Sequence, residues 1–210
     1  MKNIRVGTVG YSYRDWLGTF YPHGATPRKQ LYEYCAKFDV CELTLFTQSM
    51  PERERVAYFT NQIKGDTKFL IRLHNAFTHC ADIGMTLTLA RHFRRAFEPM
   101  YEKDRFLGFV ASFPYAFKNN PETRHYLKQL NVSLEFAGIP VQVDLRHPSW
   151  FSEASLRWIR DAGFALTCVD EPQLPGLVPS IVEMTSDICL VRLHGRNADG
   201  WWSGNSATRY

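Results

Sequence analysis

The chain has 210 residues, of which 45% are hydrophobic and 22% are charged, and its formal net charge is +4. This composition is that of an ordinary globular protein and argues against a disordered or fibrous chain. The mild positive charge permits an anionic ligand, but it does not by itself indicate nucleic-acid binding.

Strand-like and helix-like segments alternate along the chain. Short apolar, β-branched runs begin near Ile4, Val40, Lys68, Phe106, Val141, Phe164 and Ile188. Most of the intervals between these runs carry apolar residues at helical spacing. Thr26-Pro27 and Asn120-Pro121 each place a capping side chain before a proline, and Ser152 caps a further helix. The longest predicted helix carries an apolar stripe from Phe93 to Met100, whereas Pro172 to Ser186 is irregular.

This alternation predicts an α/β fold with a parallel sheet. The strand starts lie 23 to 38 residues apart, close to one unit of a (β/α)₈ barrel, which has ~250 residues in eight units. An open, doubly wound sheet is the alternative, but it usually has a glycine-rich turn after its first strand. Gly7 to Ser12 lacks the third glycine of that turn. We therefore predict a TIM (β/α)-barrel in one domain spanning residues 1–210.

Seven strands are found rather than eight. Another unit at the same spacing would start past Tyr210, and Trp201 to Tyr210 contains no strand-like run. We expect the eighth βα unit to be missing from this sequence, so that the domain is incomplete at its C-terminal end. An open seam would then separate the first and seventh strands. Unpaired strand edges favour association.

Strand parity predicts a polar site at one end of the barrel. Alternate side chains of a barrel strand face the axis. In four strands the axis-facing parity carries polar residues near the carboxyl end, namely Glu42, Thr44, Arg72, His74, Gln142, Asp144, Arg146, Arg192 and His194. Asp170 ends the sixth strand in the same way. Because barrel enzymes place their chemistry at the carboxyl-terminal mouth, we expect Glu42, Arg72, Asp144 and Arg192 to converge in one cavity.

Two interpretations of this polar set remain open. Arginines bind phosphate and carboxylate groups in bidentate fashion, which favours an anion site. The alternative is a mutual salt-bridge network, such as Glu42–Arg72 and Asp144–Arg192, that holds the barrel end together. The two are compatible. A metal cage requires carboxylates and histidines without arginines between them, so we expect no cofactor and keep a single divalent metal ion as the minor alternative.

In the anion-site interpretation, Glu42, Asp144 and His194 are the acid/base candidates. The expected substrate-binding residues are Arg72, His74, Arg146, Arg192, Arg196, Tyr11 and Trp150. The two aromatic rings in that set would stack a base or a sugar, with packing of a lid loop as the alternative. For Arg192, the alternative is that it neutralises Asp144 or Glu42. His79 has no local partner and is interpreted as a surface or packing residue.

The five cysteines, Cys35, Cys41, Cys80, Cys168 and Cys189, form no C-x-x-C pair. They are typical of reduced thiols, so we expect a cytoplasmic protein. The N-terminus lacks the apolar region of a signal peptide. The longest uncharged stretch is far shorter than the ~20 apolar residues that span a bilayer, so we expect no membrane partner.

The motifs also resemble those of the YecE-like family of bacterial and archaeal proteins of unknown function. The segments that carry the resemblance are Gly7-Thr8-x-Gly10-Tyr11-Ser12-Tyr13, Phe38-Asp39-x-x-Glu42, Thr78-His79, Phe113-Pro114-x-x-Phe117, Arg146-His147-Pro148-Ser149-Trp150-Phe151 and Arg192-Leu193-His194-Gly195-Arg196-Asn197. The resemblance implies a TIM-barrel-like fold that continues past Tyr210 into a last strand. Thr44, Thr47, Gln48, Ser112 and Asp144 depart from the family pattern.

Together these features predict an enzyme, a hydrolase, lyase or isomerase, that acts on an anionic, ring-bearing small molecule. A sugar phosphate or a nucleotide would fit. A barrel that binds or processes nucleic acid is one alternative, although the net charge supports it weakly. The other is a catalytically silent ligand-binding protein, which the departures from the family pattern favour.

Overall fold

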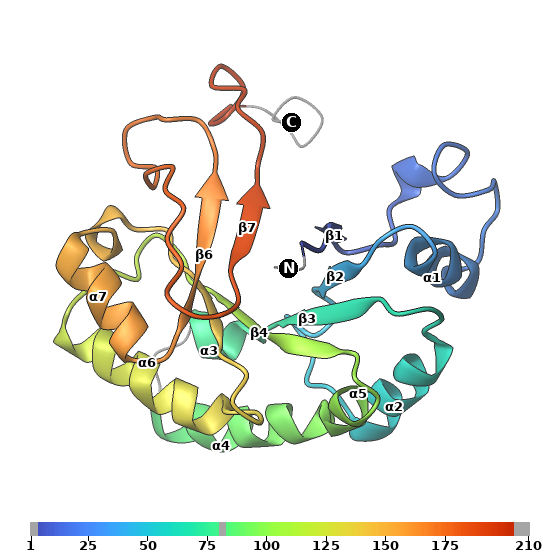
Figure 1. Ribbon diagram of the computed structural model, residues 1–210, viewed down its shortest axis with the longest axis horizontal. Helices are drawn as coiled ribbons and strands as arrows, with labels where there is room; N and C mark the ends of the chain where they lie inside the picture. Colours follow the sequence, from blue (N-terminus) through green and yellow to red (C-terminus); the bar gives the residue numbers. More distant parts are fainter. Residues whose placement is uncertain (1–3, 80–82, 204–210) are drawn as a thin grey trace.

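The computed structural model describes residues 4–79 and 83–203, with the backbone alone at residues 83–86 (Figure 1). Within these residues, seven strands form one sheet in the order β1-β2-β3-β4-β5-β6-β7, and every neighbouring pair is parallel. The strands are β1 (Gly7–Val9), β2 (Val40–Leu43), β3 (Lys68–Arg72), β4 (Phe106–Ser112), β5 (Gln142–Asp144), β6 (Ala165–Asp170) and β7 (Leu190–Leu193). The predicted parallel α/β architecture is confirmed.

The sheet curls into a half-barrel (Figure 1). Strands β1 and β7 each have one neighbour among the described residues and do not pair with each other. A complete barrel is therefore not shown. The predicted strand starts agree with the structure within two residues, except at β1. Strand β1 begins at Gly7, which pairs with Val40, the first residue of β2. A strand needs a partner, so the apolar run from Ile4 enters the sheet only where β2 begins.

The helices, apart from the short α3 that follows the carboxyl end of β3, lie on the outer, convex side of the curled sheet (Figure 1). They are α1 (Pro27–Cys35), α2 (Arg53–Gln62), α3 (Asn75–Thr78), α4 (Ile83–Ala96), α5 (Glu98–Glu102), α6 (Pro121–Leu134) and α7 (Glu153–Asp161), with 3₁₀ turns at Arg14–Trp16 and Pro148–Trp150. The predicted caps are confirmed, since the side chains of Thr26, Asn120 and Ser152 accept backbone N–H bonds. The longest predicted helix is divided because Pro99 cannot continue α4.

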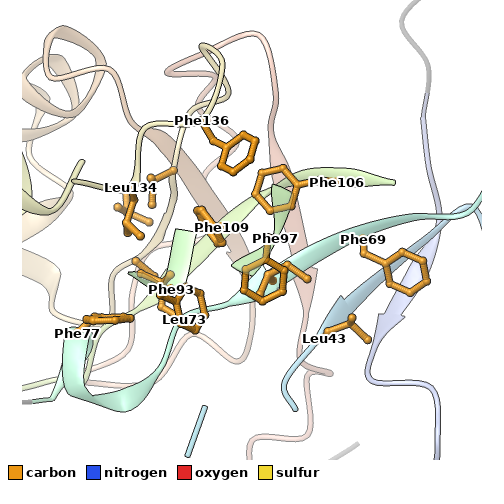
Figure 2. Packing of buried hydrophobic residues seen from close by; sticks show 14 of the residues in the cluster. Leu43, Phe69, Leu73, Phe77, Phe93, Phe97, Phe106, Phe109, Leu134 and Phe136 are labelled. Carbon is orange, nitrogen blue, oxygen red and sulfur yellow. The ribbon is translucent and has the colours of Figure 1, made fainter. Parts of the chain in front are cut away.

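The hydrophobic core fills the space between the sheet and the helices. Phe93 lies on α4, and Phe97 is the residue that follows α4. The rings of both lie within 5.7 Å, centroid to centroid, of the Phe109 ring on β4 (Figure 2). The helix-facing parity of β3 and β5 is buried as predicted. On β7 the corresponding side chains are exposed to solvent, with Val191 50% and Leu193 74% exposed. The described chain forms no helix between β6 and β7, so no helix from that interval covers the side chains of β7.

Candidate ligand site at the carboxyl ends of the strands

Glu42 is clamped between two arginines from other strands. Its Oε1 accepts a hydrogen bond from Arg72 Nε at 2.7 Å, and its Oε2 accepts one from Arg192 Nη2 at 2.7 Å. Glu42 is 4% exposed and Arg192 is 6% exposed. Burial of a carboxylate is tolerated here because both of its oxygens are matched by charged donors.

Asp144 continues this network towards β5. Its Oδ2 accepts hydrogen bonds from Arg146 Nη2 at 3.0 Å and from Ser112 Oγ at 3.1 Å, and it lies 3.5 Å from Arg192 Nε. The four residues that parity predicted to converge are therefore joined by ion pairs. The contacts include both pairs of the predicted salt-bridge network, Glu42–Arg72 and Asp144–Arg192. We refer to this set, with Arg146, as the ion network.

A second polar group adjoins Arg146. Arg146 Nη2 lies 3.2 Å from His194 Nε2, and Arg146 Nη1 lies 3.6 Å from Glu171 Oε2. Burial, with Arg146 and Arg192 adding to it, lowers the pKa of His194 to about 4, so the imidazole is neutral at pH 7. Its Nε2 then accepts from the guanidinium, which places the ring proton on Nδ1. Burial also raises the pKa of Glu171.

The end of the sixth strand differs from the prediction. Asp170 shares its parity with Leu166 in the core, so it turns away from the axis. It instead binds the exposed Arg196, through contacts of 2.9 to 3.1 Å. The next residue, Glu171, reaches the ion network. Glu171 was not among the predicted site residues, because a shift of one residue along a strand exchanges the two faces.

A cavity of about 520 Å³ opens beside the ion network. Its lining comes from the carboxyl ends of β1 to β4 and from α3, namely Val9, Thr44, Thr47, Arg72, Leu73, Asn75, Thr78, His79, Ser112, Phe113 and Pro114. Arg72 is the one arginine among these described residues, and its side chain is 28% exposed. Within the described chain its Nε is bound to Glu42, while its two Nη atoms make no hydrogen bond. Glu42 and Asp144 lie behind Arg72 and Ser112 and do not line the cavity.

The remaining predicted site residues lie elsewhere. His74 accepts a hydrogen bond from Ala76 N at 3.1 Å and so caps α3. The ring of Tyr11 contacts Tyr34 and Phe59, and burial raises its pKa to about 12. Trp150 is fully buried, and its Nε1 donates to the Phe117 carbonyl at 2.8 Å. Both aromatic rings are thus engaged in packing, which was the alternative for them.

His79 is exposed, in agreement with its interpretation as a surface residue, and it lines the cavity, which that interpretation did not include. Its Nδ1 lies 2.8 Å from Thr78 Oγ1. The Thr78-His79 pair was recognised only as a family motif. Its place in the cavity depends on α3, a four-residue helix that leaves no periodic pattern in the sequence.

Two features are absent from the described residues. No three His, Cys, Asp or Glu side chains of that set lie close enough together to hold a metal ion. None of its helices combines the length and apolarity needed to cross a membrane.

Comparison with known proteins assigns the chain to a family. The family described as "Protein of unknown function DUF72" matches residues 5–210. The chain belongs to the DUF72 family. The YecE-like resemblance of the motifs refers to the same family, so that expectation is confirmed at this level.

Solved relatives of this DUF72 chain share its fold. It is similar to a solved DUF72 family protein of Thermotoga maritima, with a TM-score of 0.82 and 31% identity over 96% of this chain and 78% of the other. A solved Enterococcus faecalis member gives a TM-score of 0.81 and 25% identity, over 96% and 74% of the two chains. UPF0759 protein YunF of Bacillus subtilis is 24% identical over 208 residues, which are 94% of this chain and 72% of YunF.

Proposed function

We propose that this DUF72 protein is an enzyme, a hydrolase, lyase or isomerase, that acts on an anionic, ring-bearing small molecule bound in the cavity at the carboxyl ends of β1 to β4. The observation that carries the proposal is the state of Arg72. Its Nε is held by Glu42, while both Nη atoms are unbonded within the described residues and the side chain lines the cavity. A fixed guanidinium with two free donors matches the geometry of a phosphate or carboxylate.

The anion-binding role falls to Arg72 rather than to Arg192. Arg192 is buried, and its charge is met by Glu42 on one side and Asp144 on the other. An added anion would have to compete with those carboxylates. Arg72 has one carboxylate partner and faces the cavity, so it has the capacity to take a second anion. In this proposal Glu42 is a positioning residue. Asp144 and His194 do not line this cavity, so their predicted acid/base roles are not part of the proposal and stay predictions.

The lining favours a sugar phosphate over a nucleotide. Five neutral hydrogen-bonding side chains share the cavity with Arg72, namely Thr44, Thr47, Asn75, Thr78 and Ser112. Hydroxyl and amide groups are suited to the hydroxyls of a sugar. The rings of Tyr11 and Trp150, which would stack a base, are taken up by packing. A cavity of about 520 Å³ is in the range of small-molecule sites.

The experiment is calorimetric titration of the protein with inorganic phosphate, glucose 6-phosphate and adenosine monophosphate. We expect glucose 6-phosphate to bind best. Arg72→Lys should weaken binding, and Arg72→Ala should weaken it by about tenfold or more, which corresponds to ~1.4 kcal/mol. Arg157→Ala is the matched control, because Arg157 forms an exposed pair with Glu153 on α7. If the Arg72 variants remain folded and bind as the parent does, the proposal is wrong.

The same samples separate the alternatives. Loss of the bound sugar phosphate with time identifies an enzyme, whereas stable binding without turnover identifies a silent ligand-binding protein. Preferential binding of single-stranded DNA, with an affinity that falls steeply as salt is added, would identify a nucleic-acid-binding barrel.

We also propose a cytoplasmic location. Its support is the state of the cysteines, since Cys35, Cys41, Cys168 and Cys189 are free thiols. Cys80 lies outside the described residues. Reduced thiols are typical of the cytoplasm, and fractionation of cells that express the protein tests the proposal.

A further inference from the structure

We infer that His79 exchanges a proton with the ligand in the cavity beside Arg72, and that Thr78 positions its imidazole. This inference rests on the proposed function, because it requires an anionic ligand in that cavity. It assigns the proton transfer to a residue outside the ion network.

The first support is the chemistry of the lining. Among the described lining residues, His79 is the one that carries an imidazole, a side chain with both a donor and an acceptor nitrogen. Arg72 stays charged, and the other lining side chains are neutral. The carboxylates of Glu42 and Asp144 are 4% and 0% exposed and have arginine partners, so a ligand in the cavity does not reach them.

The second support is the bond between Thr78 and His79. Thr78 Oγ1 lies 2.8 Å from His79 Nδ1, and Thr78 is 7% exposed. This contact engages one ring nitrogen and fixes the ring orientation. Nε2 makes no hydrogen bond within the described residues, and the proposal assigns it to the ligand. A histidine held at one nitrogen and open at the other is the arrangement that general acid/base catalysis requires.

The third support is the anchoring of α3. His74 caps its first turn, and the backbone N–H of His79 donates to the Asn75 carbonyl at 2.8 Å. Phe77 is fully buried between them, and its carbonyl accepts a hydrogen bond from Tyr126 Oη. The short helix is thus fixed at both ends and in the middle. A proton-transfer group mounted on it is held in place before the ligand arrives.

The proton transfer balances without a further reactant. The lone pair on Nε2 of the neutral imidazole takes the proton of a ligand hydroxyl, the O–H bond breaks, and its electron pair stays on the ligand oxygen. The imidazolium then lies in the same cavity as the anion bound by Arg72, which stabilises it. The reverse transfer returns the proton to a ligand oxygen and regenerates the neutral imidazole.

The test is NMR of histidine-labelled protein titrated with inorganic phosphate. The His79 signals are assigned by their absence in His79→Gln, and His125 on the exposed face of α6 is the internal control. Arg72 shares the cavity with His79, and His74 lies at the start of α3. We expect phosphate to shift the His79 signals, with the His125 signals unchanged.

Variants distinguish a proton-transfer residue from a structural one. His79→Gln should keep phosphate binding and lose turnover of glucose 6-phosphate. Thr78→Val should change the Nδ1 signal of His79, and Thr78→Ser should restore it. If phosphate binds in an Arg72-dependent manner while the His79 signals do not move, or if His79→Gln retains turnover, this inference is wrong and the proposed function stands. If phosphate and glucose 6-phosphate do not bind at all, both fail.

Discussion

Arg192 shows how strongly the interior of this half-barrel depends on single residues. Its side chain, 6% exposed, lies between the carboxylates of Glu42 and Asp144. A buried ion pair adds little net stability relative to apolar side chains of the same size, but loss of one partner leaves an uncompensated buried charge. The ion network is therefore a feature in which a single truncation has a large effect on folding.

We expect Arg192→Ala to lower the free energy of unfolding by about 3–5 kcal/mol. Arg157→Ala, which removes an exposed pair on α7, should change it by about 1 kcal/mol or less. Urea unfolding followed by circular dichroism measures both. Equal effects of the two substitutions would show that Arg192 is not needed to compensate the buried carboxylates of Glu42 and Asp144.

His194 should make stability depend on pH. Its pKa is lowered from 6.5 to about 4, mainly by burial, so the folded state disfavours the protonated imidazole. The contribution of His194 is complete above pH 6.5 and is lost as the pH falls towards 4. The raised pKa of Glu171 changes stability with pH in the opposite direction, and it is common to the parent and to His194→Gln. The parent should therefore lose stability across this interval more steeply than His194→Gln, and parallel curves would contradict the assignment.

At the scale of elements, the signals that could be predicted from the sequence are local ones. Thr26, Asn120 and Ser152 mark helix starts because a cap acts on the backbone three residues away. The ion network could be predicted as well, because the face of a strand on which a side chain lies depends only on its position along that strand. The cavity could not be predicted, since it is formed by the ends of four strands together with α3. A helix of four residues has too few positions to show a period.

The cap of α6 is open to a direct test. Asn120 and Thr123 form a reciprocal capping box at its start. We expect Asn120→Ala to lower the free energy of unfolding by about 1 kcal/mol. His125→Ala, an exposed change in the same helix, is the control. Equal stability of Asn120→Ala and the parent in thermal unfolding would mean that the cap is not needed once α6 is packed.

At the scale of the whole molecule, the two outer strands of the half-barrel determine how the chain associates. Neither β1 nor β7 has a second partner within the described residues. Apolar side chains are exposed on or next to these strands, with Val6 at 61%, Val191 at 50% and Leu193 at 74%. An unpaired edge beside exposed apolar groups promotes association between chains.

We expect the 210-residue chain to associate as its concentration rises, and we expect Val191→Lys to reduce this association. A charge on an edge strand opposes edge-to-edge pairing. Val132→Lys is the matched control, because Val132 is 72% exposed on α6, away from the edges. Sedimentation velocity would measure the effect. Equal suppression by both substitutions would show that surface charge in general, and not the β7 edge, controls association.

The proposed anion site is tested most directly by a crystal structure of the protein grown with glucose 6-phosphate. We predict the phosphate within hydrogen-bond distance of the two Nη atoms of Arg72, the sugar hydroxyls against Thr44, Asn75 and Ser112, and one of them in reach of His79 Nε2. An empty cavity, with the compound bound elsewhere or absent at a concentration that saturates binding in solution, would contradict the proposal.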